Sequence, residues 1–101
     1  MKVCWAPRAL RCLQAIGAYI GTDDPRAARR WIRRLRERAR LAGRFPRAGR
    51  VVPEFGRDEV REILVRNYRI VYRILSKEVQ VVYVFEGHQQ LSSDDLPELD
   101  D

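Results

Sequence analysis

The chain has 101 residues, enough for one domain with a modest core, and its 46% apolar and 34% charged residues are typical of a folded globular protein. This composition excludes a disordered tail, a collagen-like chain and a coiled coil. The longest uncharged run, residues 12–22, has 11 residues, whereas a membrane-spanning helix needs about 20. Arg8 and Arg11 interrupt the N-terminal apolar stretch that a secretion signal would require. We therefore expect a cytoplasmic protein that does not enter a membrane.

The basic charge is concentrated in the body of the chain. All 20 basic residues but only nine of the 14 acidic residues lie within residues 1–91, which gives this part a net charge of +11. Eighteen of the basic residues are arginine, and 11 of these lie within residues 26–50 beside one acid, Glu37. Such a field favours a polyanion such as nucleic acid, or an acidic protein partner. A solvated helix face would give the same pattern.

The first part of the sequence predicts a strand followed by two helices. A short apolar stretch, residues 2–5, precedes a proline that suits a first helical turn. Apolar residues recur at three- and four-residue spacing over residues 8–20, and Gly21 is expected to end this helix. Asp24 before Pro25 is typical of a helix start. The apolar stripe of this second helix comprises Ala28, Trp31, Ile32, Leu35, Ala39 and Ala42.

The second part predicts a loop and three strands. Residues 43–57 contain three glycines and two prolines, which indicates a long ordered loop. Alternating apolar residues then predict strands over residues 60–66, 68–75 and 79–85. The fold class is therefore α+β, in the order β-α-α-β-β-β, with a helical hairpin packed on one face of a small, mainly antiparallel sheet. In the middle strand, tyrosines are expected to face the helices and arginines the opposite side.

One domain and a short tail account for the whole chain. We assign residues 1–91 to the domain and residues 92–101 to an acidic, flexible C-terminal tail, which contains five acids and no base. One hypothesis is that this tail folds back on the arginine-rich surface and competes with an anionic partner. Cys4 and Cys12 are too few for a disulfide framework or a zinc site. We expect two reduced thiols, no metal and no cofactor.

Five segments resemble, in order and spacing, the RelE/ParE superfamily of bacterial toxins. They are Trp-Ala-Pro at residues 5–7, Asp-Pro-Arg-Ala-Ala at 24–28, the proline- and glycine-containing segment 45–55, Val-Arg-Glu-Ile at 60–63, and Asn-Tyr-Arg-Ile-Val-Tyr-Arg-Ile at 67–74. The resemblance extends over residues 5–90 of the chain. The fold of that superfamily agrees with the order of elements expected from the periodicity.

The resemblance implies the toxin of a type II toxin-antitoxin module, with roles in growth inhibition and plasmid stabilisation. A cognate antitoxin protein would hold such a toxin inactive in a toxin-antitoxin hetero-oligomer. Members of the superfamily act on one of two targets. ParE-like members inhibit DNA gyrase and block replication, whereas RelE-like members are endonucleases that cut mRNA in the ribosomal A site.

The residues that RNA cleavage requires are present in part. Metal-free cleavage needs a base, an acid and cations that stabilise a charged phosphorane. By resemblance, Arg69 aligns with an arginine that ribonucleases of the superfamily use, and Arg61 and Arg73 add charge. Glu54 is the candidate base, and His88, the only histidine, is the candidate for acid-base work. The tyrosine that follows this histidine in such ribonucleases is missing, as is the lysine cluster of RelE-like members.

A ParE-like chain is the closer resemblance. The Pro-x-x-Gly-Arg segment at residues 46–50 and the Val-Pro-Glu at 52–54 resemble ParE-type sequences. The candidate binding residues, for DNA, gyrase or an antitoxin, are Arg47, Arg50, Arg61 and Arg73. We expect a toxin that inhibits DNA gyrase by binding and is not itself an enzyme. The alternatives are a RelE-like mRNA endonuclease and a non-toxic remnant that only binds an antitoxin.

Overall fold

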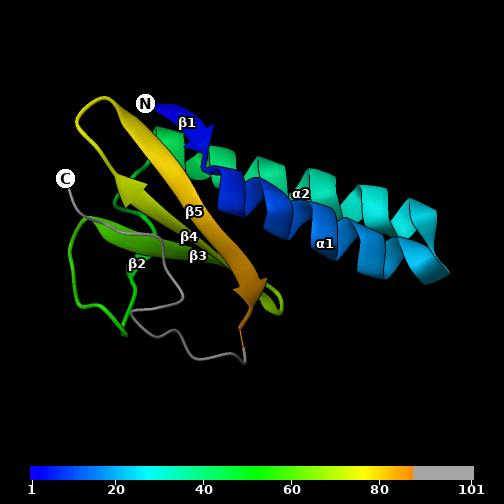
Figure 1. Ribbon diagram of the computed structural model, residues 1–101. Coiled ribbons are helices and arrows are strands. Elements are labelled where there is room, and N and C mark those ends of the chain that lie inside the picture. The colour runs from blue at the N-terminus through cyan, green and yellow to red at the C-terminus, as the bar shows by residue number, and fades with distance from the viewer. Residues whose placement is uncertain (88–101) are drawn as a thin grey trace.

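Two helices and a five-stranded sheet form the two layers of the molecule (Figure 1). The computed structural model describes residues 1–87, with β1 (Lys2–Trp5), α1 (Pro7–Asp23), α2 (Pro25–Arg44), β2 (Arg50–Val51), β3 (Val60–Val65), β4 (Tyr68–Ile74) and β5 (Glu78–Glu86). The strand order is β1-β5-β4-β3-β2, with β1 parallel to β5 and the other pairs antiparallel. The expected fold class is confirmed. His88 and the acidic tail lie outside the described residues.

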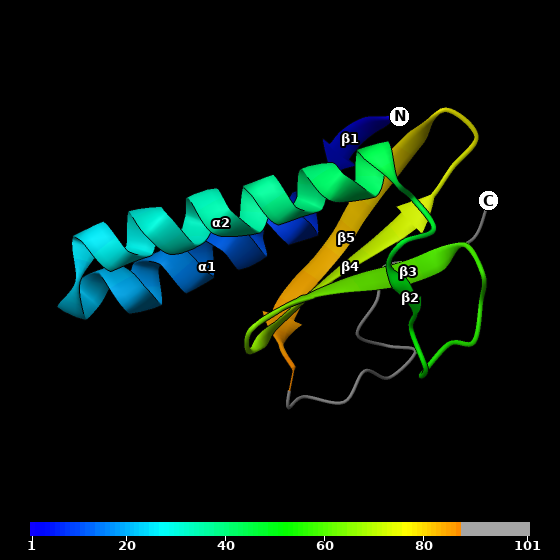
Figure 2. The ribbon, with the colours of Figure 1, turned by 180° about the vertical axis from the view of Figure 1, so that it is seen from behind.

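The helical hairpin projects well beyond the edge of the sheet (Figures 1 and 2). The prediction that α1 ends at Gly21 is wrong, because the helix continues to Asp23. The chain turns at Asp24 because this residue is extended and its side chain accepts a hydrogen bond from the backbone N–H of Ala27 at 3.0 Å, which caps α2. Gly21 instead faces the partner helix, since a Cβ there would lie 3.6 Å from the Cβ of Ala28.

The segment predicted as one long loop contains regular structure. α2 runs to Arg44, and residues 50–51 form the short strand β2. Arg50 lies opposite Glu62 and Val51 opposite Arg61 in the antiparallel ladder with β3. Two residues give too short a pattern to indicate a strand, so only pairing with β3 defines this one.

The main core lies between the helices and the sheet. Ile70 and Tyr72 of β4 are fully buried against Leu13 of α1 and Leu35 of α2. Trp5 and Trp31 pack against the margin of this cluster. No helix within residues 1–87 is long and apolar enough to cross a membrane.

The other face of the sheet carries a second, smaller apolar cluster. It comprises Val52, Val60, Val71, Val82 and Phe85. A bulge in β5 makes this cluster possible, because Val71 pairs with residue 83 while the next residue of β4 pairs with residue 81. The extra residue, Val82, shifts the alternation of β5 and turns Phe85 toward the second face. The loop after β2 covers the cluster through Val52.

The turn from α2 into β2 is fixed to the sheet by one tyrosine. The hydroxyl of Tyr72 donates a hydrogen bond to the carbonyl of Pro46 at 2.5 Å and accepts one from the N–H of Gly49 at 3.2 Å. A Cβ at Gly49 would overlap the Tyr72 hydroxyl and would lie 2.8 Å from the carbonyl oxygen of Glu62. The glycine of the Pro-x-x-Gly-Arg segment is therefore required by close approach of the backbone to β3 and β4.

We predict that Gly49→Ala lowers the free energy of unfolding by about 1 to 3 kcal/mol, because the added methyl group must displace the Tyr72 hydroxyl. Gly21→Ala is the matched control: its methyl group meets ordinary contact distances inside a helix, so stability should be unchanged or rise by up to about 1 kcal/mol. Urea unfolding followed by circular dichroism measures both. Equal effects of the two substitutions would contradict the close-approach explanation.

Candidate functional site

A buried cluster of charged side chains lies on the sheet face away from the helices, with Arg69 at its centre. The side chain of Arg69 is 8% exposed. Its Nη1 and Nη2 donate to the two carboxylate oxygens of Glu54 at 2.9 and 2.8 Å, and its Nε donates to Glu62 at 2.6 Å. The guanidinium also lies 4.9 Å from the centroid of the Phe85 ring. Two carboxylates and an aromatic ring thus enclose this one cation.

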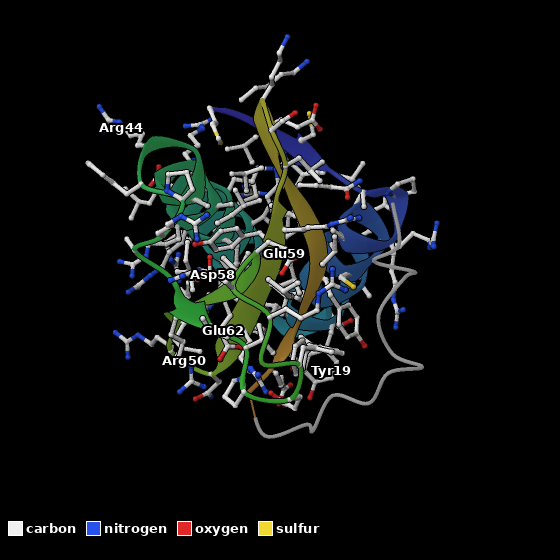
Figure 3. All side chains as sticks on the ribbon, turned by 90° about the vertical axis from the view of Figure 1, so that its left-hand side faces the viewer. Tyr19, Arg44, Arg50, Asp58, Glu59 and Glu62 are labelled. Atoms are coloured by element: carbon white, nitrogen blue, oxygen red, sulfur yellow. The ribbon has the colours of Figure 1, made fainter. Side chains whose placement is uncertain are left out.

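Glu62 links this cluster to the edge of the sheet. Its side chain is fully buried and also accepts a hydrogen bond from Nε of Arg50 at 2.5 Å. Figure 3 shows Arg50 beside Glu62 at the β2 side of the sheet. Because β3 and β4 pair with Leu64 opposite Arg69, Glu62 lies two residues away on the same face, within reach of the guanidinium.

The loop after β2 brings Glu54 to the same place. This loop closes through hydrogen bonds from the N–H groups of Phe55 and Gly56 to the carbonyl of Val52 at 3.1 and 3.0 Å. Gly56 adopts a φ of +61°, in the left-handed region that glycine enters at low cost. The turn holds Glu54 above Arg69, and the ion pair in turn holds the loop against the sheet.

The electrostatics of the cluster keep Arg69 charged. Hydrogen bonds from Arg69 to Glu54, and secondarily to Glu62, raise the pKa of Arg69 further above its ordinary value, although burial acts in the opposite direction. Protonation of Glu54 would weaken two charge-assisted hydrogen bonds to this guanidinium. Both carboxylate oxygens of Glu54 are thus occupied by Arg69.

A second group of charged residues surrounds Asp58. Arg61 is 14% exposed and donates to the Asp58 carboxylate at 2.5 Å and to the carbonyl oxygens of Asp58, Arg47 and Gly49 at 2.9, 3.0 and 2.9 Å. Arg47 also pairs with Asp58. Hydrogen bonds from Arg47 and Arg61 hold the pKa of Asp58 below its ordinary value. Arg61 thus ties the loops on either side of β2 to the sheet.

The predicted site residues therefore fall into separate groups. Arg69 and Glu54 are brought together, as a ribonuclease would require, but they bind each other. Arg47 and Arg61 share Asp58. The pKa of Glu59 is lowered mainly by a hydrogen bond from Arg57, and the charge of the nearby Arg73 makes a smaller contribution. Of the four predicted binding arginines, Arg47 and Arg50 have side chains that are more than half exposed.

Sequence reasoning did not include Glu62 in the candidate site, although this residue pairs with both Arg50 and Arg69. The signal was present in the strand alternation, because Glu62 lies between Val60 and Leu64 on the same face as Arg69. An acidic residue at a position that alternation places on a buried strand face needs a cationic partner there, because an unpaired buried charge is unfavourable. Within residues 1–87 there is no group of three or more histidines, cysteines or acids placed to hold a metal ion.

An apolar groove lies next to the charged cluster. It has a volume of about 330 Å³ and runs between the C-terminal end of α2 and the edge of β3. Leu41, Phe45 and Leu64, which line it, are 38%, 61% and 47% exposed. Arg38 and Arg50 flank these apolar side chains. β2 pairs only with Arg61 and Glu62, so the outer edge of β3 beyond Glu62 has no strand partner within the described residues.

The chain is thus a small α+β protein in which Arg69 pairs with two carboxylates of the same chain and an apolar groove lies beside β3. The profile of the family described as "ParE toxin of type II toxin-antitoxin system, parDE" matches residues 3–91. The chain belongs to this family of type II toxins.

One known protein is similar to this chain in sequence and another in fold. A protein of Sinorhizobium fredii named as a candidate toxin, Y4kP, is 39% identical over 92 residues, covering 88% of this chain and 91% of that protein. A solved structure described as the chromosomal ParDE TA system from P. aeruginosa has the same fold, with a TM-score of 0.71 at 20% identity over 85% of this chain and 95% of the other.

We predict that Glu62→Gln lowers the free energy of unfolding by about 3 kcal/mol, because it removes the buried carboxylate that accepts from Nε of the buried Arg69. Arg50→Gln is the matched control. It removes one partner of the same carboxylate, but this partner is 55% exposed, so the cost should stay below about 1 kcal/mol. Urea unfolding measures the difference. A smaller effect for Glu62 than for Arg50 would be inconsistent with a buried cluster that stabilises the fold.

Proposed function

We propose that this ParE-family toxin acts in the cytoplasm by inhibiting DNA gyrase, without enzymatic activity of its own, and that a cognate antitoxin neutralises it in a hetero-oligomer. The observation that carries the choice of binding over RNA cleavage is the enclosure of Arg69 by Glu54 and Glu62. Membership of the ParE family supports gyrase as the target, and the exposed apolar groove supports a protein partner.

RNA cleavage would need Arg69 to face the scissile phosphate. To reach that guanidinium, a phosphate would have to displace Glu54 or Glu62, and the displaced carboxylate would lose its hydrogen bonds to Arg69. The displaced Glu54 would then also have to serve as the base. An arrangement in which the cation and the base satisfy each other is better suited to holding a loop than to phosphoryl chemistry.

A binding mechanism does not require Arg69 or Glu54 to contact the target. Arg69 and Glu54 fix the loop that follows β2, and Arg61 fixes the segment that precedes it. The exposed ends of Arg47 and Arg50 are thereby held in defined positions on the surface. Contacts with gyrase or with an antitoxin then need no catalytic group, only a rigid surface of this shape and charge.

The groove beside β3 is the surface that best suits the antitoxin. An extended antitoxin segment can pair with the free edge of β3 and place apolar side chains against Leu41, Phe45 and Leu64. Acidic side chains of the same segment would meet Arg38 and Arg50 at the flanks. The net charge of +6 of the toxin chain favours an acidic partner in the same way.

The gyrase proposal is tested with toxin freed from its antitoxin. We expect the protein to inhibit supercoiling by purified gyrase and to accumulate cleaved DNA, while mRNA on programmed ribosomes stays intact. Cleaved mRNA with unaffected gyrase would refute the proposal and would make Arg69, Glu54 and His88 the first residues to substitute. Inactivity in both assays would favour a remnant that only binds an antitoxin.

The antitoxin surface is tested by Leu64→Glu, which places a charge in the apolar groove. We expect the dissociation constant for the cognate antitoxin to rise at least tenfold, which corresponds to about 1.4 kcal/mol. The matched control is Tyr19→Glu, because Tyr19 is 80% exposed on the projecting part of α1. Isothermal titration calorimetry compares the two. Equal weakening by both substitutions would exclude the groove as the docking site.

A further inference from the structure

The arginines of this protein occupy two different environments. Several arginines of the sheet and its loops bind carboxylates, among them Arg47, Arg50 and Arg61. The nine arginines of α2, from Arg26 to Arg44, are all exposed. Within residues 1–87 none of these nine forms an ion pair, and Glu37 is the one acid inside the helix. A row of guanidinium groups that have no acidic partner in the described part of the chain therefore covers the outer side of α2.

The shape of this surface is a straight ridge. α2 has 20 residues, which at 1.5 Å per residue gives a length of about 30 Å. Figure 2 shows α2 along the length of the molecule, and no described strand or helix crosses its outer side. The charges are thus presented at fixed positions along one rigid element.

One part of the ridge forms a shallow basic pocket. Arg30 and Arg34, one turn apart on α2, line it together with Trp31 and with Arg66 from the turn between β3 and β4. Trp31 is held edge-on against Tyr68, with ring centroids 5.3 Å apart. The guanidinium of Arg34 lies 5.8 Å from the centroid of the Trp31 ring. Arginine side chains carry several N–H donors each, so three of them at one pocket suit an anion.

The backbone at Arg66 is unusual for an arginine. Its φ is 53°, in the left-handed region, where glycine, asparagine and aspartate are the favoured residues. The neighbouring residue in this turn is an asparagine, so a residue better suited to that conformation lies one position away. A strained arginine beside two helical arginines points to a requirement for charge at this place.

We propose that the outer face of α2, with the pocket of Arg30, Arg34 and Arg66, binds the phosphodiester backbone of duplex nucleic acid without reading its sequence. Guanidinium groups pair with phosphates in a bidentate manner, and a row of them can follow successive phosphates of a stiff duplex. The pocket shares no lining residue with the groove beside β3, which the ridge meets at Arg38. The proposal does not depend on the proposed gyrase target.

The chemistry of α2 distinguishes a nucleic acid from an acidic protein. Protein interfaces rely on buried apolar anchors, and the only large exposed apolar residue of α2 is Leu41, at the groove end. Single-stranded nucleic acids are bound largely by stacking on open aromatic rings, whereas Trp31 packs against the core and Tyr68. A rigid row of charges without anchors or stacking platforms suits the backbone of a duplex.

Fluorescence anisotropy of the antitoxin-free toxin with labelled duplexes of random sequence tests this proposal. We expect binding to duplex DNA or duplex RNA that weakens steeply with salt, because each phosphate contact contributes about 0.9 to the slope of log K against log salt. The triple variant Arg30→Gln, Arg34→Gln and Arg66→Gln should reduce this slope by about 2 to 3 and weaken binding at least tenfold at about 100 mM salt.

A control of equal charge separates a local surface from net charge. Lys2→Gln, Arg11→Gln and Lys77→Gln also remove three exposed cations, from β1, α1 and the β4–β5 turn, and should change the affinity less than threefold. Circular dichroism shows that both variants are folded. Equal loss in the two triple variants, or tighter binding of the wild type to polyglutamate than to either duplex, would overturn the proposal. Comparing the DNA and RNA arms identifies which duplex is bound.

Discussion

The buried carboxylate of Glu62 is the interaction on which the second face of this protein depends. A fully buried carboxylate is tolerated only when cations and hydrogen bonds replace its water, and here Arg69 and Arg50 do so. The two arginines belong to β4 and β2, so one acid joins three strands. Arg69 extends the connection to Glu54 and hence to the loop after β2. Arg69 and Glu54, which the sequence suggests as catalytic residues, therefore hold the loop after β2 against the sheet.

The protein uses one residue type for two purposes. In the sheet, arginines are compensated by acids and stabilise loops. On α2, arginines face solvent and are available to a partner. Arg38 belongs to the second group and also flanks the groove beside β3, so the apolar groove and the basic ridge are continuous at the C-terminal end of α2. An acidic segment bound in the groove would lie next to the ridge and would lower the local positive potential that attracts a polyanion.

The layers of the fold could be predicted because apolar periodicity is a local property. Spacing of three and four residues identified both helices, and alternation identified β3, β4 and β5 together with the face on which Tyr72 lies. Boundaries set by contacts with other elements were not predictable. Gly21 continues α1 because it faces α2, β2 exists only through its pairing with β3, and the bulge at Val82 depends on the register between β4 and β5.

For the functional residues, the sequence by itself determined the family resemblance, the basic charge and the candidate residues Arg69 and Glu54. It did not determine that these two bind each other, because the partner of a charged side chain depends on strand register and loop position. Tertiary structure alone placed Glu62 between Arg69 and Arg50 and gave Arg61 the role of holding two loops. It also left the arginines of α2 without acidic partners among residues 1–87. The physical reason is that charge is carried by each residue, whereas its neutralisation requires a second residue that only folding brings within hydrogen-bonding distance.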